Sequence, residues 1–215
     1  MKTINFCGDS FCKEEAGKAA WTYLLSDMLQ ATIIGFGQGG SAHEHAIKSF
    51  DEQADYTIFC WTEPHRLYVN DRYSINFSTI EYKYKLDKKL NQRDTAAYAY
   101  YRSLHNSKLD IDRQTRDLYW FDNVVLSRYS GVAIHIPCFD TIYQFTNGIN
   151  IKDILHHKRL VHKLQNGDKS TEYANHLTEQ QNFELADKIY NIIKDRKSTR
   201  INSSHSQQSC MPSSA

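Results

Sequence analysis

The chain has 215 residues, and its 26 Lys and Arg residues against 25 Asp and Glu residues give a formal net charge of +1 at pH 7. This length suits one domain with a full hydrophobic core. The balanced charge, with no run of Lys and Arg, argues against nucleic acid as a partner. No apolar stretch reaches the ~20 residues of a membrane-spanning helix.

The start of the chain and the cysteines indicate in which cellular compartment the protein is expected. Met1 leads directly into strand-like sequence, without the apolar segment of a signal peptide. The cysteines have no regular spacing, and Cys7, Cys60 and Cys138 lie in apolar runs, where Cys acts as a small buried hydrophobe. We therefore expect a reducing environment, a cytoplasmic or virion-associated location and no membrane partner.

The first third of the chain alternates between strand-like and helix-like segments. Residues 4–7 form an apolar run that predicts a buried strand, and residues 12–30 carry apolar side chains at helical spacing. Residues 31–35 and 55–61 predict two further strands, with a helix over residues 41–53 between them.

The rest of the chain continues this pattern after an interruption. Residues 69–123 are rich in Tyr and charged residues and contain no Gly or Pro, which favours helices and loops inserted between core elements, and a helix continues over residues 121–129. Residues 131–139 predict the last core strand, and residues 146–167 predict a loop. A final helix follows His176.

Thr178 and Gln181 have the spacing of a capping box at the start of that final helix. Strands that alternate with helices predict an α/β fold with a parallel sheet covered on both faces, and ligands of such sheets bind beyond the carboxyl ends of the strands. Polar clusters follow three predicted strands, at residues 8–10, 37–41 and 62–66. We expect these clusters to converge.

Ser10 lies in the turn after the first predicted strand, and two roles suit it. Its hydroxyl would cap a helix beginning at Phe11 by accepting a backbone N–H bond. Alternatively, it would act as a nucleophile, with the helix N-terminus stabilising developing negative charge. The expected convergence of polar clusters favours the nucleophile.

Residues 35–40, GFGQGG, have the G-x-G-x-x-G spacing of a dinucleotide fingerprint. That fingerprint belongs after the first strand and needs an acidic residue at the end of the next one, whereas here the motif follows the second predicted strand and the next strand ends at Trp61. Nucleotide binding is therefore an alternative function that only these glycines support. We expect them to bring backbone N–H groups close to a ligand, and we expect no cofactor.

Of the ten histidines, His176 suits a general base for Ser10, because its loop can return to the carboxyl edge of the sheet. His43 and His45 have a spacing found in metal ligands, but no carboxylate-rich pattern accompanies them, and we expect no metal site. His135 lies inside a predicted core strand and reads as a structural histidine.

Three motifs together resemble the SGNH (GDSL-type) hydrolase family. They are Gly8-Asp9-Ser10 after the first strand, Gly40 in the glycine loop, and residues 175–178, NHLT, before the last helix. The resemblance spans residues 3–193 apart from the insert. The end of the third strand, WTEPHR, looks most like members encoded by phages and bacteria.

The resemblance implies a flavodoxin-like three-layer α/β/α fold and ester hydrolysis through an acyl-enzyme. Ser10 would be the nucleophile and His176 its base. The N–H groups of Ser10 and Gly40 would form part of the oxyanion hole, each donor stabilising the transition state by about 3–4 kcal/mol. Asp9 would support the turn, and the substrate would be a small-molecule or glycan ester.

Two positions depart from the family pattern. The third oxyanion donor of the family is an Asn after the third strand, where this chain has Thr62, whose hydroxyl is a candidate replacement alongside His65 and Arg66. An ionised Glu63 would repel an oxyanion, so we expect it to point elsewhere or to contact substrate. Both Glu63 and Arg66 are candidate supporting residues.

The second departure concerns the catalytic acid, which in the family stands three residues before the histidine, at the position of Tyr173. Glu172 and Asn175 are nearby candidates for supporting roles, and a Ser-His dyad or an acid from elsewhere is also open. Both departures favour an alternative function, a catalytically silent glycan-binding or structural module, whereas the retention of Ser10 and His176 favours the enzyme.

We expect one domain over residues 1–194, with the insert at 69–123 forming one wall of the cleft. Residues 195–205, DRKSTRINSSH, resemble the in-frame translation of a common sequencing adapter, which has Leu at the position of Ile201. The sequence that follows is rich in Ser and lacks periodicity, so residues 195–215 are expected to form a disordered tail.

Overall fold

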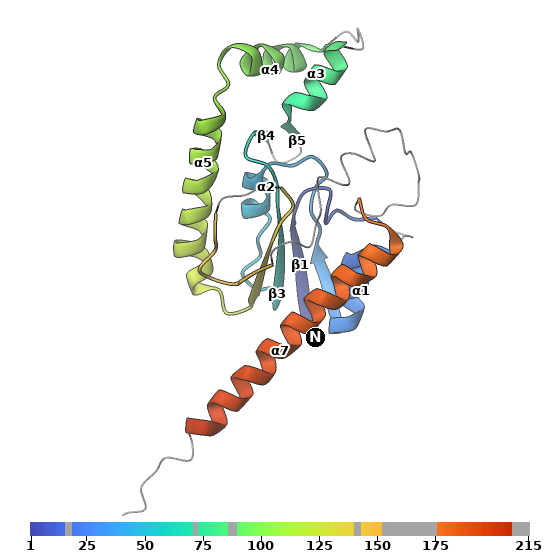
Figure 1. Cartoon of the computed structure of the whole chain (residues 1–215), viewed down its shortest axis with the longest axis vertical. Coiled ribbons are helices and arrows are strands. Elements are labelled where there is room, and N and C mark those ends of the chain that lie inside the picture. The colour runs from blue at the N-terminus through green and yellow to red at the C-terminus, as the bar shows by residue number, and fades with distance from the viewer. Residues whose placement is uncertain (16–18, 71–72, 86–89, 140–142, 152–175, 208–215) are drawn as a thin grey trace, which may run out of the picture.

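A five-stranded parallel sheet forms the centre of the protein in a computed structural model of the whole chain (Figure 1). The structure describes residues 1–15, 19–70, 73–85, 90–139, 143–151 and 176–207. The strands, in the order in which they lie across the sheet, are β2 (Ala31–Gly35), β1 (Lys2–Gly8), β3 (Tyr56–Trp61), β6 (Val132–Pro137) and β7 (Ile149–Asn150). The expected α/β class with a central parallel sheet is confirmed, and the arrangement is compatible with a flavodoxin-like three-layer fold.

Helices cover both faces of this sheet. On one face, Ile4 and Phe6 of β1 pack in a core with α1 (Trp21–Leu29) and α7 (Glu179–Gln207). On the other face, Phe59 and Trp61 of β3 pack against residues of α2 (His43–Lys48) and of the π-helix η1 (Phe121–Val125). Successive residues of a strand point to opposite faces, so the continuous apolar runs of β1 and β3 supply both cores.

The insert lies beyond the carboxyl end of the sheet, as Figure 1 shows. An antiparallel hairpin of β4 (Leu67–Asn70) and β5 (Tyr73–Ile75) leads into α3 (Phe77–Lys85) and α4 (Gln92–Ser103). Next, α5 (Ser107–Trp120) returns along the side of the sheet and continues into η1 and the short 3-10 helix η2 (Leu126–Arg128). The helices of the insert and the helical continuation were predicted, but the hairpin was not.

The insert has a small hydrophobic core of its own, formed by Ile75, Ile80, Ala97 and Tyr101. Tyr101 also ties the insert to the loop after β3, because its hydroxyl lies 2.8 Å from the His65 carbonyl and 2.8 Å from the Ile75 carbonyl. The insert is therefore anchored close to the carboxyl edge of the sheet.

Two predicted helices are shorter than expected. The first begins at Trp21, because the segment after Ser10 bonds to the glycine loop: the Gly37 N–H donates to the Cys12 carbonyl over 3.0 Å, and Lys13 forms an isolated bridge with Gly37. Ser10 therefore does not cap a helix. The second predicted helix is confined to α2, and a turn follows it in which the Gln53 N–H donates to the Asp51 carboxylate.

The final helix begins as predicted and ends later. The Thr178 N–H donates to Gln181 Oε1 over 2.9 Å and the Gln181 N–H donates to Thr178 Oγ1 over 3.2 Å, which confirms the capping box. The helix continues to Gln207, whereas the sequence predicted an irregular chain from Asp195. The loop expected at 146–167 is wrong at 149–150, which form β7 by pairing with β6, and residues 152–167 and 208–215 lie outside the described residues. None of the described helices is long and apolar enough to cross a membrane.

Candidate active site

The three polar clusters do converge at the carboxyl edge of the sheet. The chain runs from β1 to β2 on one side and then crosses to β3 on the other, so the strand order reverses between β1 and β3, the usual place for a ligand in such folds. Gly8, the last residue of β1, pairs with Cys60 of β3. A Cβ atom at Gly8 would lie against the Cys60 carbonyl oxygen, so glycine is needed where the two strand ends meet.

Hydrogen bonds fasten the glycine loop to the end of β1. The Gly8 carbonyl accepts the Gln38 N–H and the Ser41 hydroxyl, each over 2.9 Å. Because the Gly37 N–H is also used, by the Cys12 carbonyl, it is not presented to a ligand as the sequence led us to expect. Gly40 has φ +74°, a conformation that favours glycine, and no heavy atom lies within 4 Å of the position its Cβ would take.

Ser10 and His176 meet although 166 residues separate them. His176 Nε2 lies 2.7 Å from Ser10 Oγ, a hydrogen-bond distance. The imidazole packs at a tilt against the Phe11 ring, with 5.0 Å between centroids. His176 has φ +67° and lies just before the capped start of α7, where the amide of Asn182 donates to the Leu177 carbonyl. Its position is therefore set by the end of a long, packed helix.

The environment of His176 favours its neutral form. Burial lowers its pKa from the ordinary value of 6.5, and the Asp9 carboxylate opposes this shift. A neutral imidazole with its proton on Nδ1 presents the Nε2 lone pair to the Ser10 hydroxyl, which is the arrangement a general base requires.

Asp9 shapes the turn that carries Ser10. It is fully buried, and its Oδ1 accepts the Phe11 N–H over 3.1 Å. Arg66 Nη1 lies 3.2 Å from Oδ2, as an ion pair rather than a well-aligned hydrogen bond. Burial raises the pKa of Asp9, and the positive charge of Arg66 opposes the rise. Asp9 thus holds the turn and faces Arg66, not the Ser10 hydroxyl.

Arg66 joins the three polar clusters. Besides Asp9, it bonds Glu63, with 3.0 Å from Nε to Oε1, and the Ser41 carbonyl, with 2.9 Å from Nη1. Its guanidinium carbon Cζ lies over the Phe139 ring, 5.2 Å from the ring centre. These contacts make Arg66 a residue that positions the site. Sequence reasoning included Ser41 only as the last residue of the glycine cluster, and it missed Phe139.

Glu63 bonds to two neighbouring side chains, whereas the sequence left open whether it points elsewhere or contacts substrate. Its Oε1 accepts from Arg66 and, over 3.3 Å, from the Asn76 amide. Thr62 is buried, and its carbonyl accepts the Gln114 amide over 2.9 Å. The Thr62 hydroxyl lies near the Asp9 carboxyl and helps to lower its pKa, without a well-aligned hydrogen bond to any described residue.

The glycine loop passes beside the serine, since a Cβ on Gly39 would lie 3.9 Å from Ser10 Cβ. Gly40, the expected oxyanion donor, is the next residue. The candidates Glu172 and Asn175, and Tyr173 at the acid position of the family, lie outside the described residues. The structure therefore brings together Ser10, His176 and the glycine loop, with Asp9, Glu63 and Arg66 in a supporting network.

His135 has the structural role that its sequence position predicts. Its Nδ1 accepts the Trp61 indole N–H over 3.1 Å, and its Nε2–H donates to the Asn147 carbonyl over 2.9 Å. The ring stacks on Phe145 with 3.7 Å between centroids, and burial lowers its pKa to about 4. A neutral, fully bonded His135 is not available as a base.

A scan against protein-family models, a search of curated proteins and a search of solved structures each gave no match to this chain. The grounds for a function are therefore the geometry at the carboxyl edge and the three motifs that resemble SGNH hydrolases.

Proposed function

We propose that the protein is a serine ester hydrolase of the SGNH type that works through an acyl-enzyme. The observation that carries this proposal is the 2.7 Å contact between His176 Nε2 and Ser10 Oγ at the point where the strand order reverses. The competing role for Ser10, a helix cap, has lost its basis because no helix begins at Phe11.

The chemistry has two halves. In the first, Ser10 Oγ attacks the ester carbonyl while its proton moves to His176 Nε2, and the imidazolium then protonates the leaving alkoxide. In the second, His176 removes a proton from water, which attacks the acyl-serine, and the imidazolium returns the proton to Ser10 Oγ as the acid leaves. Both halves need His176 to be neutral at the start, which agrees with the lowering of its pKa by burial.

Three groups are the proposed oxyanion donors: the N–H of Ser10, the N–H of Gly40 and the hydroxyl of Thr62. The conformation of Gly40, φ +74°, gives the loop its tight path near Ser10. The Thr62 hydroxyl is buried and has no well-aligned partner among the described residues, so its proton can turn from the nearby Asp9 carboxyl toward an oxyanion. Donors already in place are effective because they need no reorganisation during the reaction.

The proposed substrate is a small-molecule or glycan ester. The insert extends beyond the carboxyl end of the sheet (Figure 1) and carries exposed aromatic side chains, among them Tyr82 and Tyr84 on α3. Tyr84 stacks on Tyr98 of α4 with 4.4 Å between centroids. Flat aromatic rings with a hydroxyl at the edge suit the mixed apolar and polar surface of a sugar.

A screen of acylated sugars and nitrophenyl esters with the full-length chain tests this function. We expect turnover that is abolished in Ser10→Ala and reduced at least ~1000-fold in His176→Ala. Ser127→Ala, which changes an exposed serine on η2, should retain full turnover. Equal residual turnover in Ser10→Ala and Ser127→Ala, with both proteins folded by circular dichroism, would contradict the proposal.

A further inference from the structure

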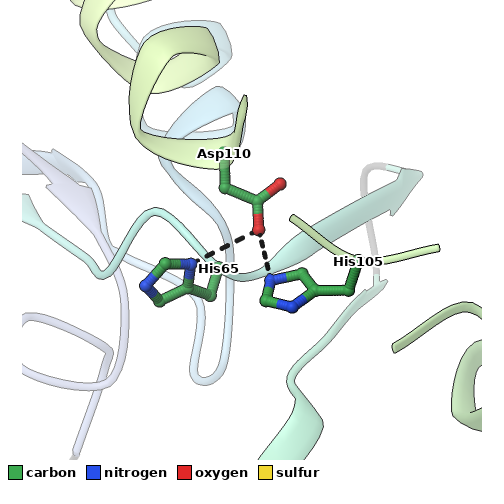
Figure 2. Close-up of side chains that lie close together, drawn as sticks. All are labelled: His65, His105 and Asp110. Atoms are coloured by element: carbon green, nitrogen blue, oxygen red, sulfur yellow. Dashed lines mark hydrogen bonds and ion pairs between the residues drawn. The ribbon is translucent and has the colours of Figure 1, made fainter. Parts of the chain in front are cut away.

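A second cluster of reactive side chains lies apart from Ser10, where the insert meets the loop after β3. Figure 2 shows the rings of His65 and His105 converging on one oxygen of Asp110. His65 Nδ1 lies 3.3 Å and His105 Nε2 lies 2.8 Å from Asp110 Oδ2. We propose that these three residues bind a divalent transition metal ion, for which Zn²⁺ fits best.

The three side chains come from the loop after β3, from the turn between α4 and α5, and from the first turn of α5, and His105 and Asp110 lie five residues apart. The His65 carbonyl accepts the Tyr101 hydroxyl over 2.8 Å, and the His105 N–H donates to the Tyr100 carbonyl over 2.9 Å. Both histidine segments are thus tied to the end of α4, which holds the ligand atoms close together before an ion arrives and lowers the entropic cost of binding.

The donor set matches the proposed ion. Two imidazole nitrogens and a carboxylate oxygen are the protein ligands of open zinc sites, which leave a further position for water. Bonds of about 2.0–2.1 Å in a tetrahedral site place neighbouring ligand atoms about 3.3–3.4 Å apart. The distance from His65 to Asp110 already has this value, and the shorter one from His105 needs to open by about half an ångström.

Solvent access and charge also suit a cation. The side chains of His65 and His105 are 37% and 20% exposed, whereas that of Asp110 is 7% exposed, so an ion can approach over the two rings. Asp110 Oδ1 lies 3.8 Å from Arg113 Nη1, on the other side of the carboxylate. Arg113 also donates to the Pro64 and Arg66 carbonyls and thereby orients Asp110 from behind, as residues outside a metal shell do.

Binding requires a change of tautomer in each ring, besides the small opening between His105 and Asp110. Without an ion, the nitrogens that face Asp110 Oδ2 carry the protons they donate to it. With an ion, the proton of His65 lies on Nε2 and that of His105 on Nδ1, and the lone pairs of the other two nitrogens become ligands. The carboxylate supplies one negative charge.

A neighbouring cluster of similar composition provides a control. His43 faces two different carboxylates, with 3.3 Å from Nδ1 to Glu44 and 3.2 Å from Nε2 to Asp117. These three groups also lie close enough together to be candidate ligands, but they include a single imidazole, whose two nitrogens face different carboxylates. His43 is also fully buried. We therefore assign the ion to Asp110 and not to Asp117.

The test is a Zn²⁺ titration of the full-length, chelator-treated chain by calorimetry, with metal content measured by atomic emission. We expect one tightly bound ion per chain and an affinity at least ~10-fold weaker in Asp110→Asn. Asp117→Asn should bind like the unchanged protein. His65→Gln, at a partly exposed position, is the second test variant if Asp110→Asn fails to fold by circular dichroism.

Co²⁺ provides an independent spectroscopic readout, because its visible absorption reports imidazole coordination. We expect the band in the unchanged chain and in Asp117→Asn, and its loss in Asp110→Asn or His65→Gln. A folded chain that binds no Zn²⁺, equal affinity in Asp110→Asn, or a loss of binding in Asp117→Asn alone would overturn the proposal. None of these readouts depends on ester hydrolysis.

Discussion

Burial lowers the pKa of His176, and this residue decides the pH dependence of the proposed reaction. The general base must be neutral, so the rate rises as the pH rises through the pKa of His176 and is level above it. We predict that the rate constant for reaction of Ser10 with an ester rises with a midpoint below the ordinary value of 6.5.

Stopped-flow rates of acylation between about pH 4 and 9 measure this midpoint. The control is His176→Ala, which should lose the pH dependence as well as the rate. A midpoint above 6.5 would contradict the lowering of the His176 pKa by burial, and a rate that falls as the pH rises through this range would show that His176 is not the base.

Arg66 is the residue whose loss should destabilise the site most. Its side chain is 7% exposed and faces Asp9, which is fully buried, so Arg66→Ala would leave a buried charge without a partner. We predict a decrease of about 3–5 kcal/mol in the free energy of unfolding, measured with urea.

Lys85→Ala is the matched control, because Lys85 pairs with Glu81 through a side chain that is 68% exposed. Exposed ion pairs contribute only about 0–1 kcal/mol. Equal losses of stability in Arg66→Ala and Lys85→Ala would mean that Arg66 does not compensate the charge of Asp9.

Motifs made the contact between Ser10 and His176 predictable, because each lies in a recognisable short pattern next to a strand or a helix. The cluster of His65, His105 and Asp110 could not be predicted in this way. Forty residues separate the two histidines, and the insert that brings them together has no motif of its own. Contacts that arise from tertiary packing are not marked by a short sequence motif.

The start of helix α7 holds His176, the proposed base, in place. The capping box of Thr178 and Gln181 begins two residues after His176. We predict that Thr178→Ala lowers the free energy of unfolding by about 1 kcal/mol and also slows acylation of Ser10, because the segment before the helix loses its anchor.

Asn91→Ala is the matched control, because it also removes a helix cap but lies in the insert, away from His176. Asn91 caps α4 in the insert by accepting the Asp94 N–H over 2.8 Å. We expect a similar loss of stability by urea denaturation and an unchanged acylation rate at saturating ester. If both variants slow acylation equally, the cap of α7 has no special role in placing His176.

Apolar runs predicted the core strands well, because a strand buried on both faces has no polar positions to confuse the pattern. The first helix was predicted too long, since residues 12–15 satisfy their backbone through the glycine loop instead of through a helix. Helical spacing of side chains does not reveal such a competing partner. The β4–β5 hairpin was missed because its strands are only four and three residues long, too short to show a pattern.

In the whole molecule, α7 closes the fold by packing beside α1 on one face of the sheet (Figure 1). Ile189 is fully buried in that interface, whereas Phe183 on the same helix is 51% exposed. We predict that Ile189→Ala lowers the free energy of unfolding by about 2–5 kcal/mol. Phe183→Ala should change it by no more than about 0.5 kcal/mol, as surface substitutions do.

Urea denaturation followed by tryptophan fluorescence measures both variants, because Trp21 of α1 lies in the same core as Ile189. Equal, small effects would mean that α7 does not contribute to the core in solution. The strand order itself, which sets the position of Ser10, could be anticipated only in outline, since alternating elements predict a parallel sheet but not which strands are neighbours.

Reaction of the full-length chain with a fluorophosphonate, followed by peptide mass spectrometry, tests the central claim most directly. An activated serine forms a stable adduct with this probe. We predict one adduct, on the peptide that contains Ser10, and its loss in both Ser10→Ala and His176→Ala. A folded protein that forms no adduct, or an adduct at Ser10 that is undiminished in His176→Ala, would contradict the account.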